Sequence, residues 1–244
     1  MEVNSDTILR NVTLRPGESN MSGMLYISRG KVTLDNIIIN NKTPDGKSCQ
    51  FSDYPIKVTG TLATLTIEGG TEIGPFPGNS CITVSYDSTV NLNGGKIQGD
   101  MQNTVEYGGG IHATDRSTVS LKGGSISGNK SGQGSGVYLD MSNLFMMKEE
   151  NGKSCQITQN TVTTEPSPKD MHGEGGGIFL IYSKAEIESG TINENKAIAA
   201  APDEYGNIRG GLGGAISAMY SNVIIKGDAE IRNNSAGNRG GAIY

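Results

Sequence analysis

The sequence predicts an all-β protein, folded as a right-handed, single-stranded parallel β-helix (a solenoid) of about eight coils. A short pattern of apolar residues recurs along almost the whole chain, and glycine recurs at fixed places within that pattern. Self-similarity at a period of roughly 20–50 residues indicates stacked repeats. The coils of such a solenoid pair their strands in parallel, and parallel strands are connected with a right-handed crossover by default.

The recurring pattern contains three registers. The first is an apolar residue after a pair of small residues, with copies at Leu25, Ile56, Ile82, Ile111, Val137, Ile178, Ile216 and Ile243; by subtraction the steps are 31, 26, 29, 26, 41, 38 and 27. The second is an apolar pair, in most copies behind a serine: Val32/Leu34, Leu65/Ile67, Val90/Leu92, Val119/Leu121, Leu144/Met146, Ala185/Ile187 and Val223/Ile225. The third is Ile-x-x-Asn: Ile8–Asn11, Ile37–Asn40, Ile126–Asn129, Ile157–Asn160, Ile192–Asn195 and Ile231–Asn234. Three short strands per repeat predict a coil with three faces.

Taken in order, the repeats differ mainly in what connects them. Residues 1–24 hold an incomplete first coil, residues 25–40 form a compact repeat, and the next three repeats are nearly unbroken. The alanine-rich stretch 196–201 predicts a single helical turn. Because the pattern spans the sequence, we interpret residues 1–244 as one β-helix repeat domain, and we expect it to be a fragment of a longer surface protein.

Glycine and asparagine mark the corners of the predicted coil. The Gly-Gly pairs at 69–70, 94–95 and 123–124 suit a turn that needs positive φ, which glycine reaches without steric cost. The asparagine of the third register is expected to stack as a ladder from coil to coil, because its amide bonds nearby backbone groups and tolerates turn geometry. The expected ladder consists of Asn11, Asn40, Asn129, Asn160, Asn195 and Asn234.

Composition excludes some classes of function. Hydrophobic residues make up 34% and aromatic residues 5%, with no Trp, which suits a narrow core of Ile, Val and Leu rather than a globular enzyme. The net charge of −5 speaks against nucleic acid, whose binding needs a basic surface. Three cysteines cannot all pair internally, and Cys49 and Cys155, which share the context Gly-Lys-Ser-Cys-Gln, lie several repeats apart, so we expect free thiols. No apolar run reaches membrane-spanning length, so we predict no membrane insertion by this stretch, and no cofactor motif is present.

Three long insertions, 41–53, 161–175 and 196–212, fall between the third register and the next first register. In a stacked array they must project from one edge, and insertions on one face are often the binding face. They carry most of the large outward groups, so the candidate binding residues are Phe51, Tyr54, His172 and Tyr205. Their charges nearly balance, which points to hydrogen bonding and stacking as the source of affinity.

Asp87, Asp115 and Asp140 precede the second register in three successive repeats. Stacked coils would place them roughly 5 Å apart, close enough to share a Ca²⁺ or to act as catalytic carboxylates. The alternative is that aspartate is a common turn residue and that Arg116 neutralises the patch. His112 is expected to point outward, and neither it nor His172 has a second histidine at ligand spacing, so no metal site is predicted beyond this weak acidic candidate.

The repeat resembles that of polymorphic outer-membrane proteins and related bacterial adhesin-like β-helix proteins, whose two signatures are Gly-Gly-Ala-Ile and Phe-x-x-Asn. Gly213–Ile216 and Gly240–Ile243 match the first signature literally. Ile replaces Phe in the second, a departure that places the chain among the broader β-helix relatives. The resemblance implies a secreted or surface-displayed passenger, often adhesive.

Two classes of function follow. The first is a non-catalytic, extracellular or cell-surface adhesin-like module that displays its loops to a host or environmental glycan or protein, with end-to-end self-association as a further expectation. The alternative is a carbohydrate-active β-helix enzyme, a polysaccharide lyase or glycoside hydrolase. An enzyme of this kind needs a groove lined by two or three carboxylates, an Arg or Lys and an aromatic ring.

Overall fold

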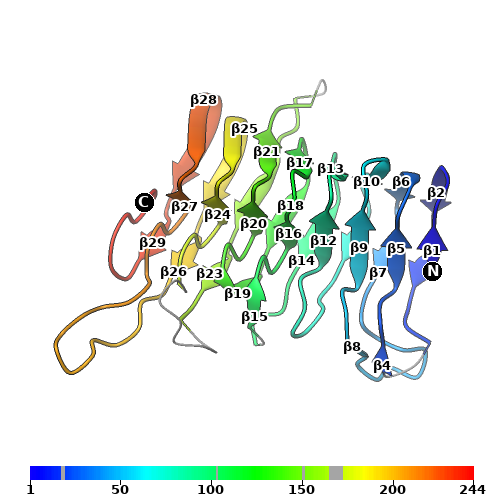
Figure 1. Cartoon of the computed structure of the whole chain (residues 1–244). Coiled ribbons are helices and arrows are strands. Elements are labelled where there is room, and N and C mark those ends of the chain that lie inside the picture. The colour runs from blue at the N-terminus through cyan, green and yellow to red at the C-terminus, as the bar shows by residue number, and fades with distance from the viewer. Residues whose placement is uncertain (18–19, 103, 150–151, 165–172) are drawn as a thin grey trace.

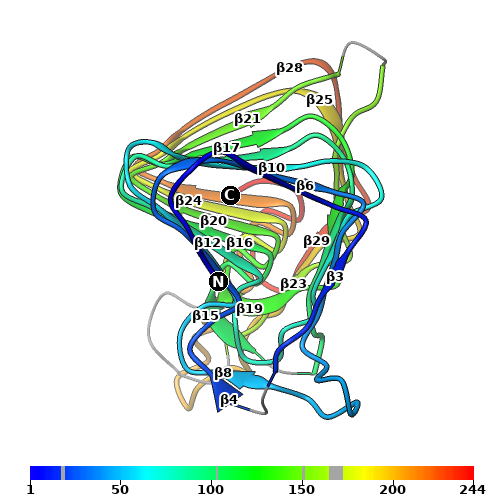
Figure 2. The ribbon, with the colours of Figure 1, turned by 90° about the vertical axis from the view of Figure 1, so that its right-hand side faces the viewer.

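The computed structural model describes residues 1–17, 20–102, 104–149, 152–164 and 173–244, and every regular element in these ranges is a β-strand. All strand pairs between named strands are parallel, and the sheets curl around a common interior (Figures 1 and 2). The all-β class and the parallel pairing are therefore confirmed. Because every described element is a strand, no helix in these ranges could cross a membrane.

An eight-stranded sheet carries the first register. Its strands, in spatial order, are β1 (Glu2–Val3), β5 (Leu25–Ile27), β9 (Ile56–Thr59), β12 (Ile82–Ser85), β16 (Ile111–Ala113), β20 (Val137–Asp140), β24 (Ile178–Ile181) and β27 (Ile216–Met219). The order of these strands in space is their order along the chain, so each coil adds one strand to the growing edge (Figure 1).

A fourteen-stranded sheet carries the second and third registers. The second register lies on β2 (Thr7–Arg10), β6 (Gly30–Asp35), β10 (Ala63–Ile67), β13 (Thr89–Leu92), β17 (Thr118–Leu121) and β21 (Asn143–Met146). The third lies on β3 (Thr13–Leu14), β7 (Ile38–Ile39), β11 (Glu72–Ile73), β14 (Lys96–Gln98), β18 (Ser125–Ser127) and β22 (Gln156–Thr158). The long strands β25 (Lys184–Asn193) and β28 (Asn222–Arg232) pass through both rows and join them.

Two smaller sheets close the coil along the remaining edge. One has five strands, β15 (Val105–Tyr107), β19 (Lys130–Gln133), β23 (Thr161–Val162), β26 (Lys196–Ala197) and β29 (Ser235–Ala236). The other pairs β4 (Asn20–Met21) with β8 (Gln50–Phe51). The helical turn expected at 196–201 is therefore wrong: Lys196 and Ala197 pair with β23, and pairing with the coil below overrides the helix propensity of alanine.

The strand register confirms the first two repeat registers and corrects the third at its beginning. Leu25 lies opposite Ile56, and Val32 and Leu34 lie opposite Leu65 and Ile67. The assignment of the first two Ile-x-x-Asn copies to the third register is wrong. The pairing places Thr7 and Leu9 opposite Val32 and Leu34, so Ile8–Asn11 belongs to the second register and Ile8 is exposed.

In the second copy the inward residue is Ile39, which lies opposite Ile73, and not Ile37. Ile37 and Ile39 are both buried, whereas Ile38 between them is exposed. A run of three isoleucines has no polar residue to show which positions face outward, and this is why the sequence alone misplaced the register.

The interior is a stack of aliphatic rows that run along the solenoid axis. Ile111, Val119, Leu121 and Ile126, one from each inward position of a central coil, are all fully buried. The corners depend on glycine: Gly124 has φ +78°, and a Cβ there would lie 2.3 Å from the carbonyl oxygen of Gly95 in the coil below. All three cysteines are free and buried, and burial raises the pKa of the Cys81 and Cys155 thiols to about 12.

Candidate functional site

The insertions at 41–53 and 196–212 project from the same edge of the molecule, the edge that carries the small sheets (Figures 1 and 2). The second insertion folds back on itself: Ala199 bridges Gly210 in antiparallel fashion, and the Ala200 amide donates to the Arg209 carbonyl. The insertion at 161–175 is described only at 161–164 and 173–175. At this edge the loops leave the coil without interrupting the three strand rows.

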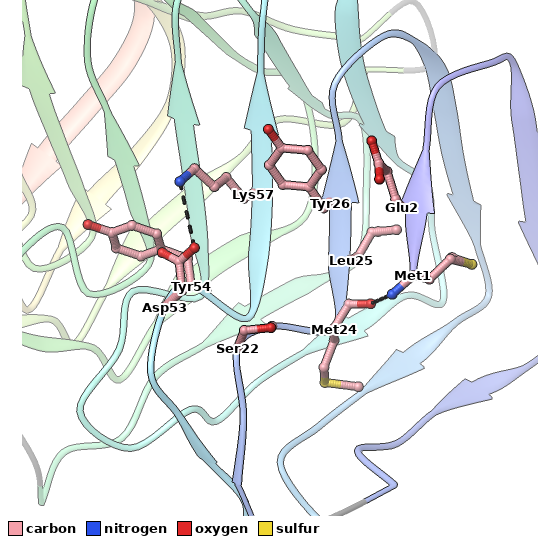
Figure 3. Close-up of a pocket in the computed structure, with 10 residues that line it drawn as sticks. Met1, Glu2, Ser22, Met24, Leu25, Tyr26, Asp53, Tyr54 and Lys57 are labelled. Atoms are coloured by element: carbon pink, nitrogen blue, oxygen red, sulfur yellow. Dashed lines mark hydrogen bonds and ion pairs between the residues drawn. The ribbon is translucent and has the colours of Figure 1, made fainter.

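A pocket of about 260 Å³ lies where the insertion at 41–53 meets the outer face of β1, β5 and β9 (Figure 3). Its floor is the outward row of the eight-stranded sheet, in which Glu2 lies opposite Tyr26 and Tyr26 lies opposite Lys57. Asp53 and Tyr54 form the side wall. Two tyrosine rings, two carboxylates and two ammonium groups, those of Lys57 and of the Met1 N-terminus, thus line one hollow.

The wall of the pocket is held by backbone contacts between two neighbouring coils. The amides of Met24 and Leu25 both donate to the Pro55 carbonyl, at 2.9 and 3.0 Å, and the Asp53 amide donates to the Ser22 carbonyl at 3.1 Å. Gly23 is required here, because a Cβ at this position would lie 2.6 Å from the Tyr54 carbonyl oxygen. Glycine therefore lets the two segments approach and set the position of Asp53 and Tyr54.

Lys57 links the floor of the pocket to its wall. Its Nζ lies 3.7 Å from a carboxylate oxygen of Asp53 and 5.5 Å from the centre of the Tyr54 ring (Figure 3). The Lys57 side chain is about one third exposed and that of Asp53 about half exposed, so both charged groups face solvent. A carboxylate and an aromatic ring both attract an ammonium group, and together they hold Lys57 across the pocket.

The four candidate binding residues have different environments. Tyr54 lines the pocket, and Tyr205 is 81% exposed at the tip of the 196–212 insertion. Phe51 was expected to face outward, but it is only 8% exposed and its ring packs edge-on against Phe76, with 5.5 Å between ring centres. This correction has a simple cause: β4 and β8 pair here, and Phe51 packs with Phe76 as part of the hydrophobic core. His172 lies outside the described residues.

The acidic turn residues do not form one row. The pairing of β13 with β17 places Asp87 opposite Arg116 rather than Asp115, and the Arg116 guanidinium binds both carboxylate oxygens of Asp87, at 2.9 and 2.8 Å. These hydrogen bonds lower the pKa of Asp87. Burial and the nearby charge of Asp115 raise the pKa of Asp140. Within the described ranges no three carboxylate, histidine or cysteine groups converge in the way that a metal ion needs.

Asn129, Asn160, Asn195 and Asn234 are hydrogen bonded from coil to coil. In each of the first three, the backbone and side-chain N–H groups donate to Oδ1 of the asparagine in the next coil, at 2.8–3.1 Å. The first three are fully buried.

The other two expected ladder residues lie elsewhere, as the register shift of the first coils requires. Asn11 is exposed and accepts a hydrogen bond from the side-chain amide of Asn36 at 2.7 Å. Asn40 accepts one from the backbone amide of Lys42 at 3.0 Å.

Sequence reasoning noted the serine ahead of the second register but gave it no role. The hydroxyl of Ser142 accepts from the Ser117 amide, and that of Ser183 from the Ser142 amide, at 3.2 and 3.0 Å. The residue just before this serine also recurs on the surface. Tyr182 and Tyr220 stack there with ring centres 5.1 Å apart and planes within 8°, and both remain exposed.

A covered aromatic cluster occupies the outer face of the central coils. The Tyr138 ring contacts Tyr107, His112 and Phe179, with ring centres 4.8, 5.1 and 5.5 Å away. Burial lowers the pKa of His112 to about 4, so the imidazole is neutral near pH 7. Close by, burial raises the pKa of Glu174, whose carboxylate lies 3.4 Å from the Ser217 hydroxyl. The expectation that His112 points outward from its strand holds, but its ring is packed rather than free.

A family model described as the Chlamydia polymorphic membrane protein repeat matches residues 228–244. This stretch contains Ile231–Asn234 and Gly240–Ile243, one copy of each repeat signature. No curated protein and no solved structure gives a significant match. The likeness supports a relation to polymorphic membrane proteins and, in general terms, a location at the cell surface.

Proposed function

We propose that this chain is a non-catalytic, adhesin-like module of a surface protein that contacts a host or environmental glycan or protein through its insertion edge. It would act as one right-handed β-helix domain of about eight coils. The repeat match at 228–244 and the unbroken pairing from β1 to β27 support this proposal. The net charge of −5 makes nucleic acid an unsuitable partner.

The observation that carries the proposal is the position of the pocket. It lies at the insertion edge and combines Tyr26 and Tyr54 with charged groups that accept and donate hydrogen bonds. Aromatic residues with a polar end are typical of contact surfaces, and loops on a rigid scaffold commonly carry binding residues. Pockets for small molecules hold a few polar groups among apolar or aromatic walls, as this one does.

The test uses the purified chain in a host-cell binding assay. Two changes are made separately: Tyr54→Ala, and replacement of 201–208 by an Asn-Gly turn, which keeps the bridge between Ala199 and Gly210. We expect each to weaken binding, Tyr54→Ala by about tenfold because a ring that stacks against a ligand contributes on the order of 1 kcal/mol. Tyr220→Ala, at a different corner of the coil, serves as the matched control.

Unchanged binding by both variants, with an unaltered far-ultraviolet circular dichroism spectrum, would contradict the proposed contact edge. The same pocket also holds the residue types that a carbohydrate-active enzyme needs: Glu2, Asp53, Lys57 and two tyrosines. Release of reducing ends from a polysaccharide, lost in Asp53→Asn, would support that second function instead.

We also propose end-to-end association with a second copy of the chain. β28 forms an edge of the fourteen-stranded sheet, and Ile225, at an inward register position, is 40% exposed there. Unpaired strand edges are templates for pairing with another chain, and head-to-tail contacts can build filaments. Sedimentation equilibrium is expected to show oligomers that Ile225→Lys dissociates, whereas Leu62→Lys, at an exposed turn, leaves them intact. A monomer at all concentrations contradicts this.

A further inference from the structure

The outer face of the eight-stranded sheet is open at one end of the solenoid and covered in its middle. Register partners along this face are Glu2, Tyr26, Lys57, Thr83, His112, Tyr138, Phe179 and Ser217. Tyr138 is 8% exposed and Phe179 is fully buried, whereas Tyr26 at the equivalent position is 40% exposed. The same row that forms a packed cluster in the central coils therefore presents a free aromatic ring in the first ones.

This open part of the row offers the contacts that a sugar ring needs. Tyr26 rises from the floor and Tyr54 from the wall, so two rings of different orientation border the hollow (Figure 3). A pyranose has an apolar C–H face and a rim of hydroxyl groups. The tyrosine rings can cover the C–H face, while the carboxylates of Glu2 and Asp53 accept hydrogen bonds from the hydroxyl groups.

The charge of the pocket lining and the volume of the pocket narrow the class of ligand further. Glu2 and Asp53 contribute two negative charges, and Lys57 and the Met1 N-terminus contribute two positive charges, so the lining has no net formal charge. Both ammonium groups already have partners: that of Lys57 lies 3.7 Å from Asp53, and that of Met1 donates to the Met24 carbonyl at 2.8 Å. An incoming anion would have to compete with these partners. The volume of about 260 Å³ is below the roughly 300–1,000 Å³ of pockets for drug-sized ligands, so it suits one or two sugar units.

We propose that this pocket binds one or two units of a neutral or amine-bearing glycan and discriminates against acidic sugars. The inference rests on the proposed function, since it names the ligand class for the same contact edge. Glu2, Tyr26 and Lys57 are then the specificity-determining residues of the floor, and Asp53 and Tyr54 those of the wall. A sugar carboxylate would meet two ammonium groups that already have partners and would lie near the like charges of Glu2 and Asp53, which disfavours acidic ligands.

The test is titration calorimetry of the purified chain with three probes: N,N′-diacetylchitobiose, the corresponding glucosamine disaccharide, and 3′-sialyllactose. We expect the neutral and amine probes to bind, and the sialylated probe to bind at least about tenfold more weakly. Tyr26→Ala should weaken binding of the first two probes about tenfold, and Tyr220→Ala, an exposed tyrosine at a different corner of the coil, should leave it unchanged.

A second variant checks the role of charge without removing a ring. Asp53→Asn combined with Glu2→Gln leaves the ammonium groups of Lys57 and of the Met1 N-terminus as the charged groups among the pocket residues. This variant should bind 3′-sialyllactose about tenfold more tightly, with a gain that salt reduces. Equal binding of the acidic and neutral probes by the unmodified chain, or no binding of either non-acidic probe, overturns the inference.

The two proposals fail in different ways. If Tyr54→Ala weakens cell binding but none of the three probes binds, the adhesive role stands and the ligand class is wrong. If the non-acidic probes bind through Tyr26 but cell binding depends on neither Tyr54 nor residues 201–208, the pocket assignment stands and the adhesive role is wrong.

Discussion

Phe179→Ala is expected to lower the free energy of unfolding by about 3–5 kcal/mol. Phe179 lies on the outward side of β24, where strand alternation would place a solvent-facing residue, but it is fully buried. Its ring stacks on Tyr138 with 5.5 Å between centres and planes within 16°, and a Cβ at Gly134 would lie 3.0 Å from the Phe179 Cβ. The backbone of the neighbouring coil therefore covers the ring, and truncation leaves a cavity that this backbone cannot fill.

The measurement is the midpoint of urea denaturation, with Tyr182→Ala as the matched control. Tyr182 follows the same strand by one residue and is 59% exposed, so its loss should change stability by less than about 1 kcal/mol. Comparable shifts for the two variants would mean that the outer face of the central coils is not a second core. A shift in the Phe179→Ala midpoint smaller than that of Tyr182→Ala would lead to the same conclusion.

Most of the strand register could be predicted from the sequence because inward residues of a solenoid repeat their own kind. Wherever apolar and polar residues alternate, as in Val119-Ser120-Leu121, a shift by one residue would expose the whole apolar set, so only one pairing is favourable. The first coils lack this contrast. Ile8 is exposed between Thr7 and Leu9, and the side-chain pattern there fits more than one register.

The candidate site could be predicted only in part, and the reason is again physical. Tyr54 was found because it follows a long insertion, and the insertions at 41–53 and 196–212 do share an edge. Tyr26 and Lys57 were not found, because strand alternation shows that a residue points outward but not whether another segment covers it. Tyr26 and Phe179 occupy equivalent positions, and only the path of the neighbouring chain leaves one open and buries the other.

The row of exposed side chains at the turns before the second register could not be predicted from the sequence, for a different reason. Met141, Tyr182 and Tyr220 sit at positive φ, a region that favours glycine or asparagine, so turn propensity predicts small polar residues there. The recurrent serine that follows was the available signal, since its hydroxyl accepts a hydrogen bond from the backbone amide of the corresponding serine in the coil before it. Like the asparagine row, this serine row links neighbouring coils through side-chain oxygens that accept hydrogen bonds from backbone amides.

Asn160→Ala is expected to lower the free energy of unfolding by about 3 kcal/mol, because it leaves several buried groups without partners. The Asn160 amide nitrogen donates to the Ile126 carbonyl at 3.1 Å and to Asn195 Oδ1 at 2.9 Å, and its Oδ1 accepts from the backbone and side-chain N–H groups of Asn129. Alanine removes all of these bonds in a fully buried site, where water cannot replace them.

The control is Asn11→Ala, which removes an exposed asparagine that bonds Asn36 and should cost less than about 1 kcal/mol. Asn160→Asp separates shape from hydrogen bonding. It keeps the volume and the acceptor, but it places a carboxylate oxygen against the Ile126 carbonyl, so it should destabilise the protein at neutral pH and less so in acid, where the carboxyl is protonated and can donate. Urea denaturation of the three variants at pH 7 and pH 4 measures this. An Asp variant as stable as the unmodified chain at pH 7 would show that the asparagine row contributes packing rather than donor–acceptor pairing.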